Sequence, residues 1–213
     1  MTSYQIDIKQ CPKCGCEFTA WEVASCNTFG AKFYTDGFVK GPMYDRGSPV
    51  LICPGCEIYF WREDVPTRES MSDNKYFINH VANSAERSFP NSGWVQGHHY
   101  EDMVRQSFWR NPEEEKYIRK RAWWLHNSAY RDDSTQEFRL TTEQEENMRR
   151  LVQLLDTDDP DESLMKAEIL RELGQFDECL KLLANPFDER LLQTVNVIKD
   201  LAHNRKRKVE LLG

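Results

Sequence analysis

Two short stretches decide how the first part of this chain folds: CPKCG at residues 11–15 and CPGC at residues 53–56. In each stretch two residues separate a pair of cysteines, so both sulfur atoms can reach one metal ion. A proline stiffens the start of each turn, and Gly15 and Gly55 supply the left-handed or tight backbone that it needs. Four thiolates suit a structural Zn²⁺ ion, so the paired spacing predicts one zinc site. Its expected ligands are Cys11, Cys14, Cys53 and Cys56.

The other cysteines carry a weaker signal. The chain has 7 cysteines, and an odd number fits poorly with a disulfide framework. Cys16 follows Cys14 too closely to add a comfortable fifth ligand to a closed tetrahedral site. The simplest interpretation of Cys16 and of Cys26 is a small buried residue or a spare thiol. A second metal site shared with His98 or His99 stays open as an alternative.

Strand patterns surround both cysteine pairs. Alternating residues at 4–8 predict a half-buried strand that runs into the first pair, and further strands are expected at 18–23, 50–52 and 58–61. Between the pairs, Asp36-Gly37 is a strong two-residue turn signal, which predicts an inserted β-hairpin from 32–35 and 38–40. Residues 4–62 resemble the zinc ribbon family, in which two CPxC-type knuckles at the tips of β-hairpins share one zinc. The 38 residues between Cys14 and Cys53 form a longer spacer than in compact ribbons.

Helical patterns take over after Val65-Pro66. Asn111 is a cap residue and Pro112 a first-turn residue, which predicts a helix over about 112–129. A capping box at residues 142–145 begins a second helix that runs to about residue 155. Gly174 is a typical C-cap for the next helix. Three further helices are expected at residues 159–174, 176–184 and 189–203.

Residues 164–183 resemble a tetratricopeptide unit, a hairpin of two helices. The residues that carry this resemblance are Leu164, Ala167, Gly174, Phe176, Cys179 and Leu183. The resemblance implies that Cys179 is a packing residue in a slot for a small side chain. Because one such unit cannot bury its own faces, the helices at 143–155 and 189–203 are expected to cover it.

The fold class expected from these patterns is α+β. We expect a zinc ribbon with an inserted hairpin at residues 1–66, a Trp-rich, mainly helical connecting region at 67–140, and a tetratricopeptide-like helical bundle at 141–213. The combination of ribbon, AWWL at 122–125 and LGQFDE at 173–178 also resembles uncharacterised bacterial zinc ribbon proteins. That resemblance implies a fold and a compartment, and it brings no assigned activity.

Composition narrows the functional classes. The chain has 213 residues, and 28 Lys+Arg against 35 Asp+Glu give a formal net charge of -7. An acidic balance argues against a protein whose main task is to coat nucleic acid or an anionic membrane. No apolar run approaches the roughly 20 residues that span a bilayer, and the first residues do not form a standard secretion signal. We therefore expect a cytoplasmic protein without a membrane partner.

Histidine and tryptophan residues offer two alternatives. In a loop, His98-His99 could supply one ligand or one catalytic base, although adjacent side chains face different ways. The alternative is that the pair belongs to a polar loop or a helix cap without a catalytic role. The tryptophans at 94, 109, 123 and 124 are expected mainly in the core, because an indole buries a large apolar area. The alternative is a protein-binding surface that uses Trp109, Trp123 and Trp124.

A basic run at residues 205–208 is the remaining functional signal. It consists of Arg205, Lys206, Arg207 and Lys208. These residues could contact nucleic acid, but cations at a helix C-terminus also offset the helix dipole. The sequence lacks the GxxxxGK[ST], HExxH and GxSxG motifs of common enzymes. We therefore expect a non-enzymatic adaptor protein with one structural Zn²⁺ ion, whose partner is another protein. The alternatives are a nucleic-acid-associated accessory protein and an enzyme with a site near His98 and His99.

Overall fold

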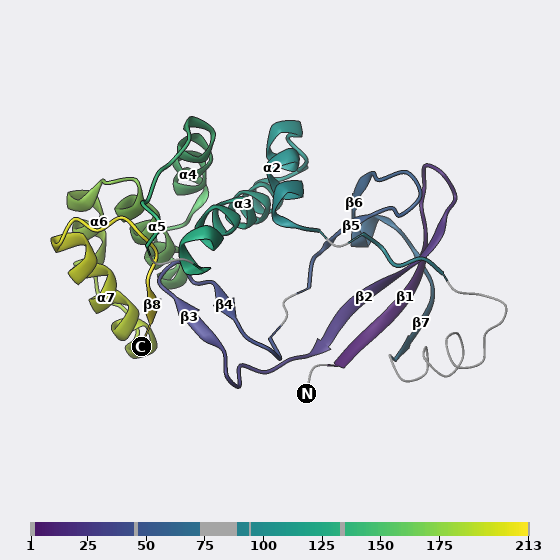
Figure 1. Cartoon of the computed structure of the whole chain (residues 1–213), viewed down its shortest axis with the longest axis horizontal. Coiled ribbons are helices and arrows are strands. Elements are labelled where there is room, and N and C mark those ends of the chain that lie inside the picture. The colour runs from purple at the N-terminus through teal and green to yellow at the C-terminus, as the bar shows by residue number, and fades with distance from the viewer. Residues whose placement is uncertain (1–2, 45–46, 73–88, 94, 133–134, 213) are drawn as a thin grey trace. The chain divides into compact units, whose positions relative to one another are not determined.

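The computed structural model describes residues 3–44, 47–72, 89–93, 95–132 and 135–212 and has a mixed α+β fold (Figure 1). The chain divides into two compact units. The sheet unit comprises Met1–Ala31 and Lys40–Gln96, and the helical unit comprises Lys32–Val39 and Gly97–Gly213. Within the described residues, no helix combines the length and the apolar character needed to cross a membrane. Residues 73–88 of the expected connecting region lie outside the described part.

The sheet unit contains two small antiparallel sheets. The first has the strand order β2-β1-β7, and the second pairs β5 with β6. The expected strands on both sides of each cysteine pair are present, and β7 is an addition that the sequence patterns did not predict. The strands are β1 (Ser3–Gln10), β2 (Glu17–Ser25), β5 (Val50–Ile52), β6 (Tyr59–Trp61) and β7 (Thr67–Ser72), with a short helix η1 (Arg62–Asp64) between the last two.

Strand β1 is buried on both faces over part of its length, whereas its alternating sequence predicts one solvated face. Asp7 and Lys9 are buried because the fold gives them partners. Lys9 Nζ donates to the carbonyl oxygens of Val65 at 2.7 Å and Arg62 at 3.2 Å, and to Thr67 Oγ1 at 3.1 Å. Burial lowers the pKa of Lys9, while the Asp7 carboxylate opposes this. These contacts tie β1 to the chain that leads from η1 into β7.

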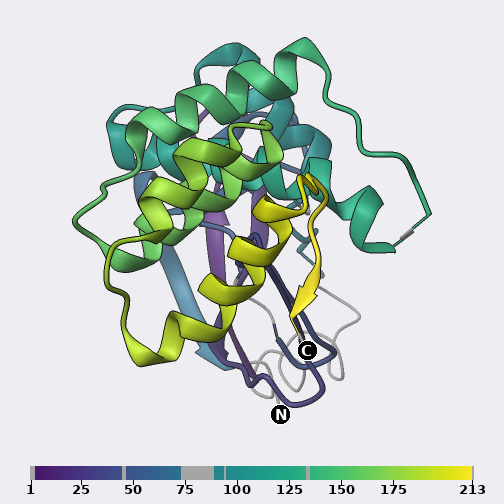
Figure 2. The same cartoon turned by 90° about the vertical axis from the view of Figure 1, so that its left-hand side faces the viewer.

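The helical unit holds the six α-helices of the described part (Figure 2). All five expected helices are present, and the first of the six is an addition. They are α2 (Gly97–Gln106), α3 (Pro112–Asp132), α4 (Thr142–Leu154), α5 (Pro160–Glu172), α6 (Phe176–Leu183) and α7 (Leu192–His203), the last preceded by a short helix η3 (Glu189–Leu191).

Local capping explains where these helices begin and end. Asn111 Oδ1 accepts from the Glu114 N–H at 3.0 Å, as the sequence predicts. Gly174 adopts a φ of 81° just after α5, which is the left-handed conformation of a glycine C-cap. The capping box of α4 lies one residue earlier than expected. The Gln144 N–H donates to Thr141 Oγ1, and the Thr141 N–H donates to Gln144 Oε1. The sequence TTEQE offers two overlapping boxes, and the structure uses the first.

The expected inserted hairpin is formed by β3 (Lys32–Tyr34) and β4 (Val39–Lys40). Tyr34 N–H donates to the Phe38 carbonyl oxygen at 3.0 Å, and Gly37 has a φ of 74° in the turn. The hairpin gains a third strand, β8 (Leu211–Leu212), in the order β4-β3-β8. No local pattern predicts this pairing, since the two partners are far apart in the sequence.

A core cluster joins α5, α6 and α7. Ala167, Cys179 and Leu183 are fully buried in it, and Ile198 of α7 packs against them. Burial raises the pKa of the Cys179 thiol to about 12, which keeps it neutral. Cys179 is therefore a small apolar packing residue of the helical core.

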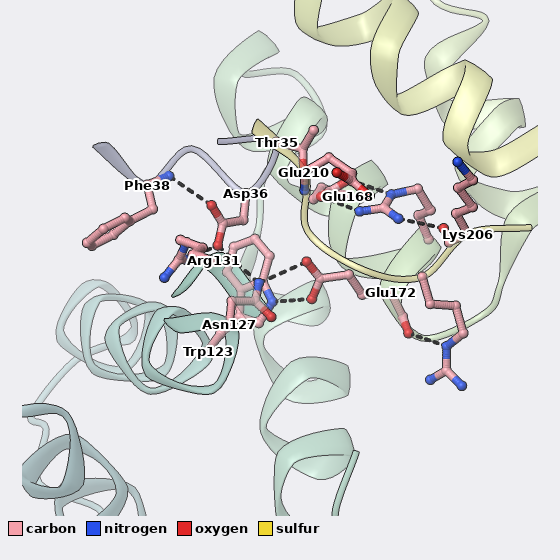
Figure 3. Close-up of polar contacts among 12 residues, drawn as sticks. Thr35, Asp36, Phe38, Trp123, Asn127, Arg131, Glu168, Glu172, Lys206 and Glu210 are labelled. Atoms are coloured by element: carbon pink, nitrogen blue, oxygen red, sulfur yellow. Dashed lines mark hydrogen bonds and ion pairs between the residues drawn. The ribbon is translucent and has the colours of Figure 1, made fainter. Parts of the chain in front are cut away.

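A buried polar network links α3 and α5 to the β3–β4 turn (Figure 3). Asn127 Nδ2 donates to Asp36 Oδ2 at 3.0 Å and to Glu172 Oε1 at 2.9 Å. Trp123 Nε1 donates to the other Glu172 oxygen at 2.7 Å. Arg131 forms an ion pair with Asp36, and both side chains are buried. The turn is thus fixed by side chains of two helices.

The same network holds the end of the chain (Figure 3). Arg171 pairs with Glu168, and both side chains are 0% exposed. Arg171 Nη1 also donates to the Lys206 carbonyl oxygen at 2.5 Å. Burial raises the pKa of Glu172 well above its usual value, and the charge of Glu168 adds to this effect. Burial also raises the pKa of Asp36, although the nearby Arg131 charge opposes this rise.

The buried Arg171–Glu168 pair gives the first prediction. In Glu168→Gln the Arg171 guanidinium stays buried without a counter-charge, so the free energy of unfolding should fall by about 3–5 kcal/mol. The exposed pair Arg190–Asp161, with N and O atoms 2.5 Å apart, is the matched control. Arg190→Gln should cost less than about 1 kcal/mol, because solvent screens this pair. Urea unfolding followed by helical circular dichroism measures both, and equal losses would contradict the prediction.

Candidate metal centre

The first knuckle, residues 11–15, closes the hairpin of β1 and β2. Cys11 N–H donates to the Cys16 carbonyl oxygen at 2.8 Å, and Gly15 N–H donates to the Cys11 carbonyl oxygen at 3.0 Å. Gly15 has a φ of 74°, the left-handed conformation expected for it. These bonds fold the backbone back beneath the two sulfur atoms, so that Cys11 and Cys14 face the same side.

The second knuckle, residues 53–57, repeats this geometry at the end of β5 and β6. Cys53 N–H donates to the Ile58 carbonyl oxygen at 3.1 Å, and Glu57 N–H donates to the Cys53 carbonyl oxygen at 2.9 Å. Glu57 has a φ of 58° and occupies the left-handed position that Gly15 has in the first knuckle. Gly55 instead permits close approach, since a Cβ atom there would lie 3.2 Å from Cys16 Cβ.

The two knuckles bring four sulfur atoms together. Cys11 Sγ lies 3.7 Å from Cys56 Sγ, and Cys14 Sγ lies 3.6 Å from Cys53 Sγ. All four Sγ atoms lie within 4.8 Å of one another. These separations are too long for a disulfide, whose sulfur atoms are about 2.05 Å apart. They match a tetrahedral site, because metal–sulfur bonds of about 2.3 Å place the sulfur atoms about 3.8 Å apart. The cluster is compatible with one metal ion.

The electrostatics of the cluster also favour a cation. Burial raises the pKa of Cys56 to about 12, and its thiol neighbours Cys14, Cys53 and Cys11 add to the rise. Burial acts in the same direction on Cys11, but nearby backbone amides outweigh it and hold its pKa at about 7. Four adjacent thiols therefore cannot all ionise by themselves. A bound divalent cation would offset their charges and release the protons.

The remaining cysteines lie outside the cluster. Cys16 is half-buried next to it, and its thiol contacts the Glu17 carbonyl oxygen at 3.6 Å. Cys26 is exposed and Cys179 is buried in the helical unit. Among the described residues, the four-thiol cluster is the one group of three or more metal-ligand side chains close enough to share an ion.

His98 and His99 lie in the first turn of α2, so the expected loop was wrong and the pair lies at a helix end. Gly97 allows this helix to begin against α3, because a Cβ atom there would lie 2.1 Å from Leu125 Cδ1. The two imidazole rings are 3.9 Å apart, and burial and the His98 charge lower the pKa of His99. The sequence did not predict α2, since its apolar pattern is short and interrupted by polar residues.

The tryptophans lie in packed surroundings. Trp123 and Trp124 are 1% and 5% exposed, and Trp124 Nε1 donates to the Asp36 carbonyl oxygen at 2.9 Å. Trp109 is half-buried beneath the Arg119 guanidinium, at 5.0 Å from the ring centroid. Trp94 lies outside the described residues. Trp123 and Trp124 therefore present almost no surface that a partner could contact.

The basic run contacts the protein itself. Arg205 stacks over the Phe176 ring at 4.9 Å. Arg207 Nε and Lys208 Nζ each donate to a backbone carbonyl oxygen, at 2.7 and 3.0 Å, and the Lys206 carbonyl oxygen accepts from the buried Arg171. These contacts attach the run to the helical unit. Phosphate groups would have to compete with them.

The knuckle backbones give the second prediction. Because a residue with a Cβ atom is strained in the left-handed region, Glu57→Gly should raise the free energy of unfolding by about 1 kcal/mol. Gly15→Ala, at φ 74°, should lower it by a similar amount. Glu63→Gly is the control, because Glu63 lies in η1 without a positive φ and should only lose stability. Thermal unfolding of metal-loaded protein measures the three changes; a loss in Glu57→Gly would contradict the argument.

Comparison with known proteins identifies no relative of this chain. No family model, no curated protein and no solved structure matches this chain significantly. The function therefore has to be inferred from the geometry and chemistry of its own residues, and the four-thiol cluster is the strongest feature for that purpose.

Proposed function

We propose that this protein is a cytoplasmic, non-enzymatic adaptor in which one structural Zn²⁺ ion fixes an N-terminal zinc ribbon. One observation carries this proposal. The ends of two hairpins bring four thiols together, and the distances between their sulfur atoms match a tetrahedral site. A tetrahedral set of four thiolates suits zinc or an iron–sulfur site, and a set with no open position suits a structural role. One knuckle at the tip of each hairpin supports the ribbon assignment.

The metal would act as part of the core of the sheet unit. Cys11 and Cys53 are buried in a cluster with Phe18, Leu51 and Phe60. This cluster is small, and strands β5 and β6 have three residues each. A sheet of that size buries too little apolar area to be stable by itself, so the metal–sulfur bonds would provide much of its folding free energy.

The third prediction tests the ion. Purified full-length protein should contain about one zinc ion per chain, because the cluster offers one complete tetrahedral ligand set. Cys53→Ser should lose the ion, because it removes a buried ligand, whereas Cys26→Ser should keep it, because Cys26 is exposed and outside the cluster. Elemental analysis gives the stoichiometry, and the absorption of Co²⁺-substituted protein reports the number of thiolates. Two zinc ions per chain, or full retention in Cys53→Ser, would refute the assignment.

We also propose that α5 and α6 form a tetratricopeptide-like hairpin. Its support is that residues at the family positions, among them Ala167, Phe176 and Cys179, share one core cluster. Val195 and Ile198 of α7 pack into the same cluster and cover the hairpin. A third helix thus takes the place that a neighbouring repeat has in an array.

For the contact with a protein partner, we propose the exposed loop that follows β2. Phe29 in this loop is 78% exposed. This is the highest exposed fraction of the large apolar side chains in the described residues. Its backbone is ordered by a bond from Phe29 N–H to Asn27 Oδ1 at 2.9 Å. An exposed aromatic side chain can act as a binding anchor. Phe29 is therefore a better candidate for the contact with a partner than Trp123 and Trp124, which are buried.

The fourth prediction tests the partner. A photoreactive phenylalanine analogue at position 29 of the zinc-loaded protein should form a discrete protein adduct in cells, because Phe29 is available for contact. The same analogue at Glu178, an exposed position on α6, is the control and should not form that adduct. Nuclease treatment should leave the adduct unchanged. An adduct that nuclease removes would contradict the adaptor proposal and favour the accessory role of Arg205, Lys206, Arg207 and Lys208.

A further inference from the structure

The four thiols of the metal centre differ in their access to solvent, although the two knuckles have the same backbone geometry. Cys11 and Cys53 are 2% and 0% exposed, and both belong to the apolar core cluster of the sheet unit. Cys56 is half-buried and packs against the margin of that cluster. Cys14 is exposed and is not part of it. A reagent that approaches from solvent therefore meets Cys14 first.

The second knuckle leaves Cys14 uncovered and places a partner thiol beside it. Gly55 lies next to both sulfur atoms, since its N–H donates to Cys53 Sγ at 3.3 Å and a Cβ atom there would lie 3.5 Å from Cys14 Sγ. Because Gly55 has no side chain, it places nothing over the exposed sulfur. Cys14 Sγ and Cys53 Sγ are 3.6 Å apart. Side-chain rotation has to bring them only about 1.5 Å closer to reach the length of a disulfide bond.

The other cysteines lack this combination. Cys11 Sγ and Cys56 Sγ are 3.7 Å apart, but Cys11 is buried. Cys16 is half-buried, and its thiol contacts the Glu17 carbonyl oxygen at 3.6 Å. Cys26 is exposed but lies outside the cluster. Cys14 is therefore the exposed sulfur that has a cluster thiol at close range.

We propose that Cys14 is a site of oxidation by hydrogen peroxide and that Cys53 then forms a disulfide with it. The inference rests on the structural metal site proposed above and adds a redox regulation to it. A bound Zn²⁺ ion keeps its cysteine ligands deprotonated, and the thiolate is the form of cysteine that reacts with peroxides.

The reaction has two steps. The Cys14 thiolate attacks one oxygen of the peroxide, so that the O–O bond breaks, an S–O bond forms, and the leaving hydroxide takes a proton to become water. The Cys53 thiolate then attacks the Cys14 sulfur, so that an S–S bond forms, the S–O bond breaks, and a second hydroxide leaves as water. The two sulfur atoms together lose two electrons, which reduce one hydrogen peroxide molecule to two water molecules.

The disulfide removes two of the four metal ligands, so the site can no longer hold its ion in a tetrahedral set. Strands β5 and β6 have three residues each and depend on that ion for much of their stability. The helical unit has core clusters of its own and should keep its helices. Oxidation should therefore release the zinc ion and open the sheet unit alone.

The test uses full-length, zinc-loaded protein with the substitution Cys26→Ser, which removes an exposed thiol outside the cluster. Hydrogen peroxide is added stepwise, and a chromophoric chelator measures free zinc. One zinc ion should be released for each peroxide molecule consumed, and peptide mapping by mass spectrometry should find Cys14 linked to Cys53. Helical circular dichroism should persist, and a phosphine reductant with added zinc should restore the metal. The additional substitution Cys16→Ser is the control and should leave the rate of release unchanged.

Three results overturn the proposal: zinc that is retained in excess peroxide, a disulfide that joins Cys14 to Cys16 or Cys11 to Cys56, and slower release in the Cys16→Ser control. Oxidation of Cys14 to a sulfinic acid without a disulfide overturns the role of Cys53. Protein purified without metal contradicts the proposed function instead. A disulfide between Cys14 and Cys53 in that protein would still support the oxidation site, and its absence would overturn it.

Discussion

The sheet unit depends on one constraint, which is that four sulfur atoms from two hairpins lie within 4.8 Å of one another. Each knuckle positions its two sulfur atoms with the same pair of backbone hydrogen bonds. The left-handed position is occupied by Gly15 in the first knuckle and by Glu57 in the second. Burial, together with the neighbouring thiols, raises the pKa of Cys56 to about 12, so this thiol does not ionise readily without a cation. The geometry that organises the strands is therefore also the geometry that favours a metal ion.

The helical unit depends on a different interaction, a buried network of charges. Asp36 of the inserted hairpin and Glu172 of α5 are joined through Asn127, and Arg171 reaches the backbone of Lys206 near the end of the chain. Three segments distant in the sequence are thus held together by buried side chains, and the loss of one charged partner would leave the other charge buried and unpaired, which is costly. This explains why the basic run serves the fold, and why the hairpin belongs to the helical unit.

The candidate sites differ in what they require of the chain. The thiol cluster is closed and symmetric, which suits a structural ion. The exposed Phe29 suits a protein contact. These features use separate residues, so the metal centre and the recognition of a partner can be tested one at a time.

The sequence by itself determined what depends on neighbouring residues: the two CPxC turns with their flanking strands, the Asp36-Gly37 hairpin, and the helices with caps such as Asn111 and Gly174. The spacing of the cysteines also predicted which four of them lie together in one cluster. Tertiary structure alone decided the pairing of β3 with β8, the position of His98 in a helix, the burial of Lys9 and the burial of His126 Nε2 without a partner among the described residues. The physical reason is the distance along the sequence between the residues that interact. Caps and turns are satisfied within a few residues, whereas a buried charge or an added strand depends on partners that only folding brings near.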